Sequence, residues 1–394
     1  MNRDTGTSSK PSKQVTKSQK KILEAAAAIW EENATAKESA YMARQLVQCT
    51  LPHKNPGDVP IWRRKNGNLI LGIQPGRNVR TGESYGYPYG TIPRLLLFWL
   101  VTEAVRTKSP KIELGNSLGE FMRELGLDSS RGGNGSPAHR LKNQMERLFN
   151  ALISFDGEMT KDGKTGNARL NMVVARKTVF WWSEKSPEQG AFWESSIELG
   201  QDFYEAITAA PVPVDMRVLQ ALKQSPLALD LYAWLTYEAF RANKGGKVRF
   251  TSFEQLHAQM GGEYADINDF RKKGVKPALV KIRTVYPGLK LGIKQGGIEV
   301  LPESLPALQP RTITIDGVAV RVGSAPVASP LELSTTGKQI KPATIEKFRL
   351  FYPRFDPYAC KVDFDAWQET LPPEKQAKRY DAAFLGFAKK WVTG

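Results

Sequence analysis

Residues 93–155 decide the fold and read PRLLLFWLVTEAVRTKSPKIELGNSLGEFMRELGLDSSRGGNGSPAHRLKNQMERLFNALISF. The start and stop signals and the apolar spacing of this stretch predict a helix, a short strand, a helix, a loop, a helix and a strand in that order. Pro93 suits the first position of the first helix. Apolar side chains then recur at the spacing of one buried helical face. They are Leu96, Leu97, Leu100, Val101 and Ala104.

The second and third helices have clear start signals. Ser117 with Glu120 predicts a capping box, and Gly126 ends that second helix. Ser136 with Pro137 predicts the start of the third helix after a loop over 129–135.

The third helix has two contrasting sides. Its apolar side carries Leu141, Met145, Leu148, Phe149 and Leu152. Its polar side carries Arg140, Asn143, Arg147 and Asn150. An apolar back, an Arg/Asn front and a following β-hairpin are the layout of a winged helix, whose third helix enters the DNA major groove. A merely solvated polar face is the alternative.

The predicted wing follows this helix. Strand-like segments at 153–155 and 168–182 are separated by the turn signals Asp156-Gly157 and Asp162-Gly163. Lys164 and Arg169 are candidates for phosphate contacts, although lysines at strand edges also serve to block aggregation.

The same pattern occurs a second time. The motif WLxxEAxR at residues 99–106 recurs at 234–241, an offset of 135 (234 − 99). At the same offset Ser252 and Gly261 match the cap and end of the second helix. A basic helix between Asp269 and Tyr286 and a hairpin over 289–301 complete the copy, and Pro277 predicts a kink or a late start in that helix.

The predicted fold is therefore α+β, with two tandem winged-helix domains, a disordered N-terminal tail and a small helical C-terminal module. Five parts are expected. They are a basic tail and helix (1–50), the first winged-helix domain (51–205), the second (206–302), a linker with a small hairpin (303–342) and the C-terminal module (343–394).

Composition favours a nucleic-acid partner. The 394 residues carry a net charge of +16, which suits a polyanion, and no long amphipathic basic helix suggests a membrane surface. The two cysteines, Cys49 and Cys360, are too few for a disulfide framework and indicate a reducing compartment. Without a signal peptide or an apolar run of about 18 residues, the protein is expected in the cytoplasm of a bacterium.

Several segments resemble the plasmid replication initiators called RepA, in their C-terminal-domain family. The resemblance covers roughly 51–301 and is strongest in the first copy. It rests on Tyr87 to Arg94, Trp99, Thr102 to Ala104, Leu114-Gly115-x-Ser117, Phe121 and Leu125-Gly126. Residues 269–273 and 277–279 also resemble the second winged helix of iteron-binding Rep initiators.

The resemblance implies a function. Such a protein binds repeated double-stranded sites at a plasmid origin, opens the adjacent duplex and recruits host machinery, such as the replicative helicase or the host initiator. The C-terminal module is a candidate for docking that partner. A homodimer is left open, and no membrane partner is expected.

The predicted DNA contacts lie on the two basic helices. For base reading in the first module we expect Arg140, Asn143 and Arg147, because arginine bonds guanine bidentately and asparagine bonds adenine. For the second module the candidates suit phosphate contact at least as well as base reading. They are Arg271, Lys272, Lys273, Lys276 and Arg283. A solvated surface charge is the alternative for each.

Enzyme motifs are not evident in the sequence. Gly157 and Gly163-Lys164-Thr165 have five residues between the glycines, where a P-loop needs four. His53, His139 and His257 have no zinc-ligand spacing, and the His-x-His of a nicking enzyme is missing. We therefore expect no catalysis, metal or cofactor. A transcriptional or copy-control repressor with the same fold is the main alternative to an initiator, and a nickase is a distant third.

Overall fold

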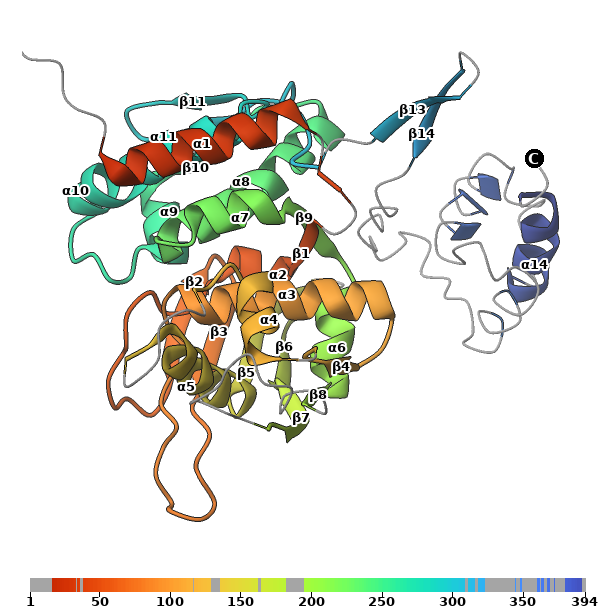
Figure 1. Cartoon of the computed structure of the whole chain (residues 1–394). Coiled ribbons are helices and arrows are strands. Elements are labelled where there is room, and N and C mark those ends of the chain that lie inside the picture. Colours follow the sequence, from red (N-terminus) through yellow and green to blue (C-terminus); the bar gives the residue numbers. More distant parts are fainter. Residues whose placement is uncertain are drawn as a thin grey trace, which may run out of the picture. The chain divides into compact units, whose positions relative to one another are not determined.

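The structure is a computed structural model (Figure 1). It describes residues 16–32, 34–35, 38–115, 117–128, 135–161, 164–181, 195–308, 311–315, 318–322, 344, 348, 360–361, 363–364, 367–368, 372 and 380–391. The chain divides into two compact units. The main body comprises Met1–Ile207 and Val212–Ser324, and the C-terminal unit comprises Thr208–Pro211 and Ala325–Gly394.

The first half of the main body is built around a buried helix. Figure 1 labels its framework elements. They are α3 (Thr91–Thr107), β4 (Lys111–Glu113), α4 (Leu118–Glu124), α5 (Pro137–Phe149), β7 (Ala175–Val179) and β8 (Ser196–Leu199). Helix α3 is buried from Pro93 to Val101, which agrees with its almost unbroken apolar sequence. The three strands form an antiparallel sheet in the order β4-β8-β7.

The second half repeats this framework. After α6 (Gln201–Thr208) its elements begin with a strand and two helices. They are β9 (Pro211–Asp215), α7 (Met216–Leu222) and α8 (Pro226–Gly245). The rest are β10 (Arg249–Ser252), α9 (Phe253–Met260), α10 (Ile267–Asp269), the π-helix η2 (Phe270–Val275), α11 (Lys276–Val285), β11 (Leu291–Ile293) and β12 (Gly297–Val300). The sheet order β10-β12-β11 matches β4-β8-β7, because the first strand again pairs with the last.

The repeated motif has the same physical role in both halves. Trp99 and Trp234 are both buried. Glu103 forms an ion pair with Arg106 three residues on, and Glu238 does the same with Arg241. The repeat predicted from the sequence is therefore confirmed, and so is the α+β class.

Among the described residues, the first half has a further sheet that the second half lacks. It contains β2 (Trp62–Asn66), β3 (Leu69–Gln74), β5 (Leu152–Lys161) and β6 (Lys164–Val173), in the order β2-β3-β5-β6 with antiparallel pairing throughout. Alternate side chains bury one face against the core. They include Leu71, Ile73, Ile153, Phe155 and Met172.

This sheet corrects the predicted wing. The segments 153–155 and 168–182 were expected to form one hairpin, and the structure confirms this only for 168–173, where Ile153 lies opposite Met172. The hairpin of β5 and β6 extends the sheet of β3, while β7 pairs with β8 beside β4. Residues 153–155 therefore belong to a central strand, because their buried alternation matches that of β3 as well as that of β6, and Ile73 lies opposite Ile153.

The predicted helix starts hold, but α5 ends at Phe149, and Leu152, which was expected on its apolar side, begins β5. The Ser117 hydroxyl accepts from the Glu120 amide at 3.1 Å, and Ser252 forms a capping box with Gln255. Lys276 begins α11 directly after η2, and Pro277 is its second residue. The helical run itself begins at Ile267, and the disturbance predicted at Pro277 takes the form of the π-helix before it, because proline cannot donate the bond that a regular helix would need at this point.

The N-terminal elements are α1 (Lys17–Glu31), β1 (Ser39–Ala43) and α2 (Arg44–Gln48). Strand β1 pairs with β9, and α1 packs against α7 and α11. The predicted small hairpin is present as β13 (Arg311–Ile315) and β14 (Val318–Val322). The tail over 1–15 and most of the linker lie outside the described residues.

The C-terminal unit includes α14 (Tyr380–Trp391). Its small core contains Phe348, Cys360, Phe364, Phe384 and Ala388. The predicted helical mini-core is confirmed for the residues that are described. Among those residues no helix has both the length and the apolar character that crossing a bilayer requires.

Candidate nucleic-acid interface

Helix α5 presents the predicted reading face of the first half. The Ser136 hydroxyl accepts from the His139 amide at 3.1 Å, and Pro137 follows at the first turn. Leu141, Met145 and Leu148 are fully buried on the back of the helix, which packs towards α3. Arg140 is exposed on its front.

Two of the predicted reading residues have internal partners. Arg147 donates from Nε to Asn143 Oδ1 at 2.7 Å and from Nη1 to the Tyr87 carbonyl at 3.2 Å. Its guanidinium also lies 5.3 Å from the centre of the Tyr89 ring. Arg147, held by Asn143, therefore fixes the segment before α3 against α5. Arg140 is the most accessible of the three predicted residues.

The two predicted wing residues lie on β6. The exposed Arg169 pairs across the hairpin with Asp156 at 2.7 Å. Lys164 begins β6, and its side chain lies outside the described residues. These positions belong to the inserted sheet and not to the framework sheet.

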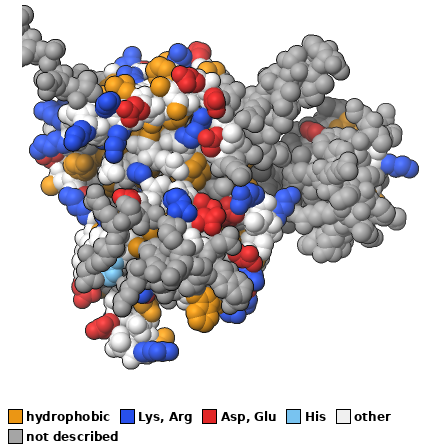
Figure 2. All heavy atoms as spheres, viewed as in Figure 1, with side chains coloured by type: hydrophobic (Ala, Val, Ile, Leu, Met, Phe, Trp, Pro, Cys, Tyr) orange, Lys and Arg blue, Asp and Glu red, His pale blue; other side chains and the backbone are white. Residues whose placement is uncertain are grey.

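The second basic helix has a continuous exposed stripe. Lys272, Lys276, Val280 and Arg283 recur at four, four and three residues, and all are exposed. Arg283 also donates to the Leu291 carbonyl at 2.8 Å. Figure 2 shows Lys and Arg side chains gathered over the region of α1, α10 and α11.

The other two predicted residues of this helix have partners of their own. Lys273 is exposed and pairs with Asp269 at 2.7 Å. Arg271 lies 5.8 Å from the Phe253 ring centre and donates to the Gln295 carbonyl at 3.4 Å. Arg271 therefore ties the helix to the turn before β12, whereas Lys272 and Lys276 are exposed to solvent.

A buried ionic network joins the two halves. Arg94 of α3 donates from Nε and Nη2 to the two carboxylate oxygens of Asp230 on α8, at 2.8 and 2.7 Å. It also donates to the carbonyls of Leu51, Pro52 and Gly90. Burial alone would raise the pKa of Asp230, but the charge of Arg94 and hydrogen bonds from His53 and Arg94 outweigh it and hold that pKa well below its usual range.

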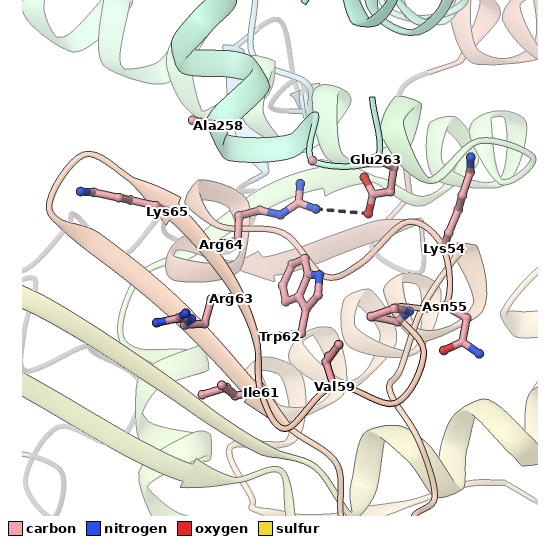
Figure 3. Close-up of a pocket in the computed structure, with 12 residues that line it drawn as sticks. Lys54, Asn55, Val59, Ile61, Trp62, Arg63, Arg64, Lys65, Ala258 and Glu263 are labelled. Atoms are coloured by element: carbon pink, nitrogen blue, oxygen red, sulfur yellow. Dashed lines mark hydrogen bonds and ion pairs between the residues drawn. The ribbon is translucent and has the colours of Figure 1, made fainter. Parts of the chain in front are cut away.

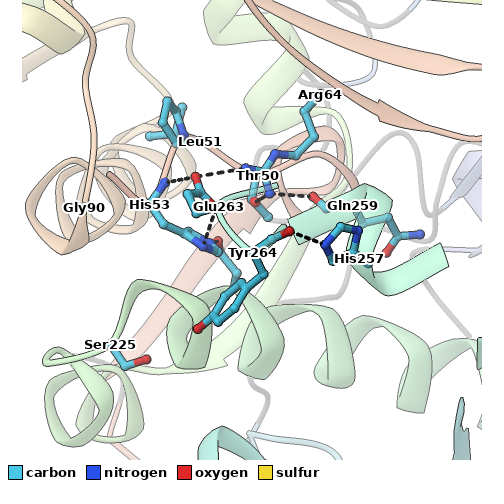
Figure 4. A network of polar contacts seen from close by, with 12 residues as sticks. Thr50, Leu51, His53, Arg64, Gly90, Ser225, His257, Gln259, Glu263 and Tyr264 are labelled. Atoms are coloured by element: carbon cyan, nitrogen blue, oxygen red, sulfur yellow. Dashed lines mark hydrogen bonds and ion pairs between the residues drawn. The ribbon is translucent and has the colours of Figure 1, made fainter. Parts of the chain in front are cut away.

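His53 extends this network to a second carboxylate (Figure 4). Its Nε2 lies 2.8 Å from Asp230 Oδ2 and its Nδ1 lies 3.1 Å from Glu263 Oε2. Glu263 also lies 3.3 Å from Arg64 of β2. Burial would raise the pKa of Glu263, but the His53 hydrogen bonds and the charges of His53 and Arg64 lower it to about 2. The network thus fixes the two halves to each other.

Sequence reasoning did not identify this network. One signal was available, because Asp230 interrupts the apolar run over 227–235, where an unpaired acid would be costly. Arg94 stands in the quoted family segment, but nothing in the sequence placed it opposite Asp230. Among the described residues, no cluster of His, Cys, Asp and Glu side chains is arranged to hold a metal ion.

A basic hollow lies beside the network (Figure 3). Its volume is about 460 Å³, and it is lined by β2, the segment before β2 and the end of α9. Lys54, Arg63 and Lys65 are exposed at its walls, and the Arg64 guanidinium lies 4.8 Å from the Trp62 ring centre. The hollow adds positive charge to the first half.

The comparisons identify a family for the central part of the chain. Residues 87–254 match the family model described as "Plasmid encoded RepA protein". This match confirms, over this range, the resemblance to RepA seen in the sequence. A comparison with curated protein sequences finds no match.

Two solved structures are similar to the chain. One is a crystal structure of selenomethionine derivatives of domains 2 and 3 of RctB, with 12% identity and a TM-score of 0.39, covering 68% of this chain and 97% of that one. A second crystal structure of RctB domains 2 and 3 has the same identity and TM-score, with coverage of 65% and 94%.

Proposed function

We propose that the chain is a plasmid replication initiator that binds repeated duplex sites at its origin. The match of residues 87–254 to plasmid RepA carries this proposal, because it spans α3 to β10 and so includes α5. The net charge of +16 supports a polyanionic partner. The chain would act by binding, without catalysis or a cofactor.

We further propose that each half is a winged-helix module. Each has a helix, strand, helix, basic helix and two strands in that order, with the first strand paired to the last. In this arrangement the basic helix occupies the major groove and the two-stranded hairpin lies near the phosphates. Arg140 on α5 and the stripe of Lys272, Lys276 and Arg283 are the proposed DNA contacts.

Replication in cells tests the function directly. A plasmid without any other origin, carrying this gene with its flanking DNA, is expected to be maintained. Arg140→Ala should abolish maintenance, whereas Arg106→Ala, which changes an exposed arginine at the end of α3, should not. Normal maintenance of the Arg140→Ala plasmid would contradict the role of α5. Binding to a single promoter site without any maintenance would favour a repressor.

The C-terminal unit is the proposed docking site for a host replication protein. It has a small aromatic core of its own, so its deletion should leave DNA binding intact. Removing residues 343–394 is expected to abolish plasmid maintenance while the purified protein still binds origin DNA. Unchanged maintenance would overturn this part of the proposal.

A further inference from the structure

A projecting arm lies between β3 and α3. It consists of residues 74–86, and Figure 1 shows it in orange extending away from the rest of the main body. The framework of the second half has no corresponding segment between α7 and α8, which are separated by 223–225. The arm is therefore a feature of the first half.

The arm is a hairpin with its own hydrogen bonds. The Tyr85 amide donates to the Gly76 carbonyl at 3.0 Å, and the Asn78 amide donates to the Glu83 carbonyl at 2.8 Å. Arg77 Nη1 donates to the Gly82 carbonyl at 2.9 Å, and Gly82 has a φ of +72° that completes the turn. These bonds give the arm a defined shape up to its tip.

The base of the arm is fixed to α5. A Cβ on Gly76 would lie 2.2 Å from the Asn150 carbonyl oxygen, so the backbone touches the end of that helix. Gly86, with a φ of +77°, lies against Arg147 in the same way, because a Cβ on Gly86 would lie 2.9 Å from Arg147 Nη1. The direction of the arm is therefore set by the proposed recognition helix itself.

The tip of the arm combines positive charge with an apolar side chain. Val79 is 99% exposed, and Arg77 and Arg80 are exposed on either side of it. Within the described part of the chain, the Arg80 side chain has no hydrogen bond or ion pair. Neither Val79 nor Arg80 thus contributes packing or pairing to the folded chain.

We propose that this arm is a second DNA contact of the first half, and that it places Arg80 and Val79 in the minor groove next to the major-groove segment that faces α5. The minor groove is about 6 Å wide, and arginine is the side chain drawn to its negative potential. Apolar side chains that enter this groove pack between base steps. The proposal rests on the proposed function, because it requires α5 to face DNA.

The test uses the full-length chain and the duplex that it enriches from a random pool. Arg80→Ala and Val79→Ala should each weaken binding to this duplex, Arg80→Ala by about 10-fold, the size of one lost arginine contact. Hydroxyl-radical cleavage should show lost protection of one minor-groove segment. Methylation protection of guanines in the neighbouring major groove should remain.

Matched controls separate the arm from general charge and apolar effects. Arg106→Ala removes an exposed arginine at the far end of α3, and Val248→Ala removes a half-exposed valine in the second half. Both should bind as the unaltered chain does. Replacing A·T by I·C pairs in the segment protected by the arm should leave affinity unchanged, because the minor-groove pattern is kept while the major-groove pattern changes.

The outcomes distinguish the arm from the proposed function. If Arg140→Ala loses binding while Arg80→Ala and Val79→Ala keep both affinity and footprint, the arm proposal is wrong and the role of α5 stands. If the arm variants lose binding and Arg140→Ala does not, the arm contacts DNA without α5, and the paired arrangement is wrong. A chain that enriches no duplex overturns both.

Discussion

The two halves of the main body share a framework but differ in what has been added to it. The second half runs directly from α7 to α8 and from α11 to β11, whereas the first half contains β2, β3 and the arm at one of these places and β5 and β6 at the other. The two additions meet in one four-stranded sheet. A repeated framework therefore supplies two similar basic helices, and the additions make the first half a distinct surface.

The contact between the halves gives the largest expected effect. Asp230→Ala leaves Arg94 buried without its carboxylate partner, so the free energy of unfolding should fall by about 3–5 kcal/mol. Urea denaturation of the full chain measures this. Asp269→Ala, which removes the exposed partner of Lys273, should change it by less than about 1 kcal/mol. Similar small losses in both variants would mean that the halves are held together by other contacts.

The added sheet can be compared with the framework by matched cavities. Ile153 in the added sheet and Ile298 in the second framework sheet are both fully buried. Ile153→Ala and Ile298→Ala should each lower the free energy of unfolding by about 3 kcal/mol, because each leaves a cavity in a packed core. Urea denaturation measures this. A cost below about 1 kcal/mol for Ile153→Ala alone would show that the added sheet is not part of the core.

Acid should weaken the contact between the halves. The pKa of Glu263 is lowered from 4.5 to about 2, so its stabilising contribution is complete above about pH 4.5 and is lost as the pH falls towards 2. The pKa of Asp230 is also lowered, so its stabilising contribution is likewise lost as the pH falls. Glu263→Gln should be less stable at neutral pH and lose less stability on acidification. Unfolding curves at a series of pH values measure this, and parallel curves for the two proteins would contradict it.

Helix capping should be equivalent in the two halves. Ser117→Ala and Ser252→Ala each remove a hydroxyl that accepts from a first-turn amide, at 3.1 and 3.2 Å. Each alanine variant should lower the free energy of unfolding by about 1 kcal/mol, and each corresponding glycine variant should lower it by only a few tenths of a kcal/mol. Thermal unfolding of the four variants tests this. A clear difference between the two serines would break the equivalence of α4 and α9.

Local signals in the sequence were sufficient for the framework. The caps at Ser117, Ser136 and Ser252, the break at Pro277 and the repeated WLxxEAxR motif all depend on residues within a few positions of each other. Such short-range preferences are readable without the rest of the fold. These local signals correctly predicted where both basic helices lie in the sequence.

Long-range pairing was not readable in this way. Residues 153–155 pair with both β3 and β6, and only the nearby partner β6 was predicted, because alternation alone does not show which strand lies on the other side. For the same reason Arg94 could not be assigned to Asp230, which lies 136 residues away. The internal partners of Asn143 and Arg147 depend on the segment at Tyr87, which α5 meets only in the folded chain.

In the proposed function, both halves place a basic helix on DNA in a fixed arrangement. Methylation-protection footprinting of the full chain on its own origin tests this most directly, with Arg140→Ala and Lys276→Ala as the two variants. We expect two protected major-groove segments about one helical turn apart, with each variant losing a different one. If both variants leave the same segments protected, the helices α5 and α11 do not read DNA in the way proposed.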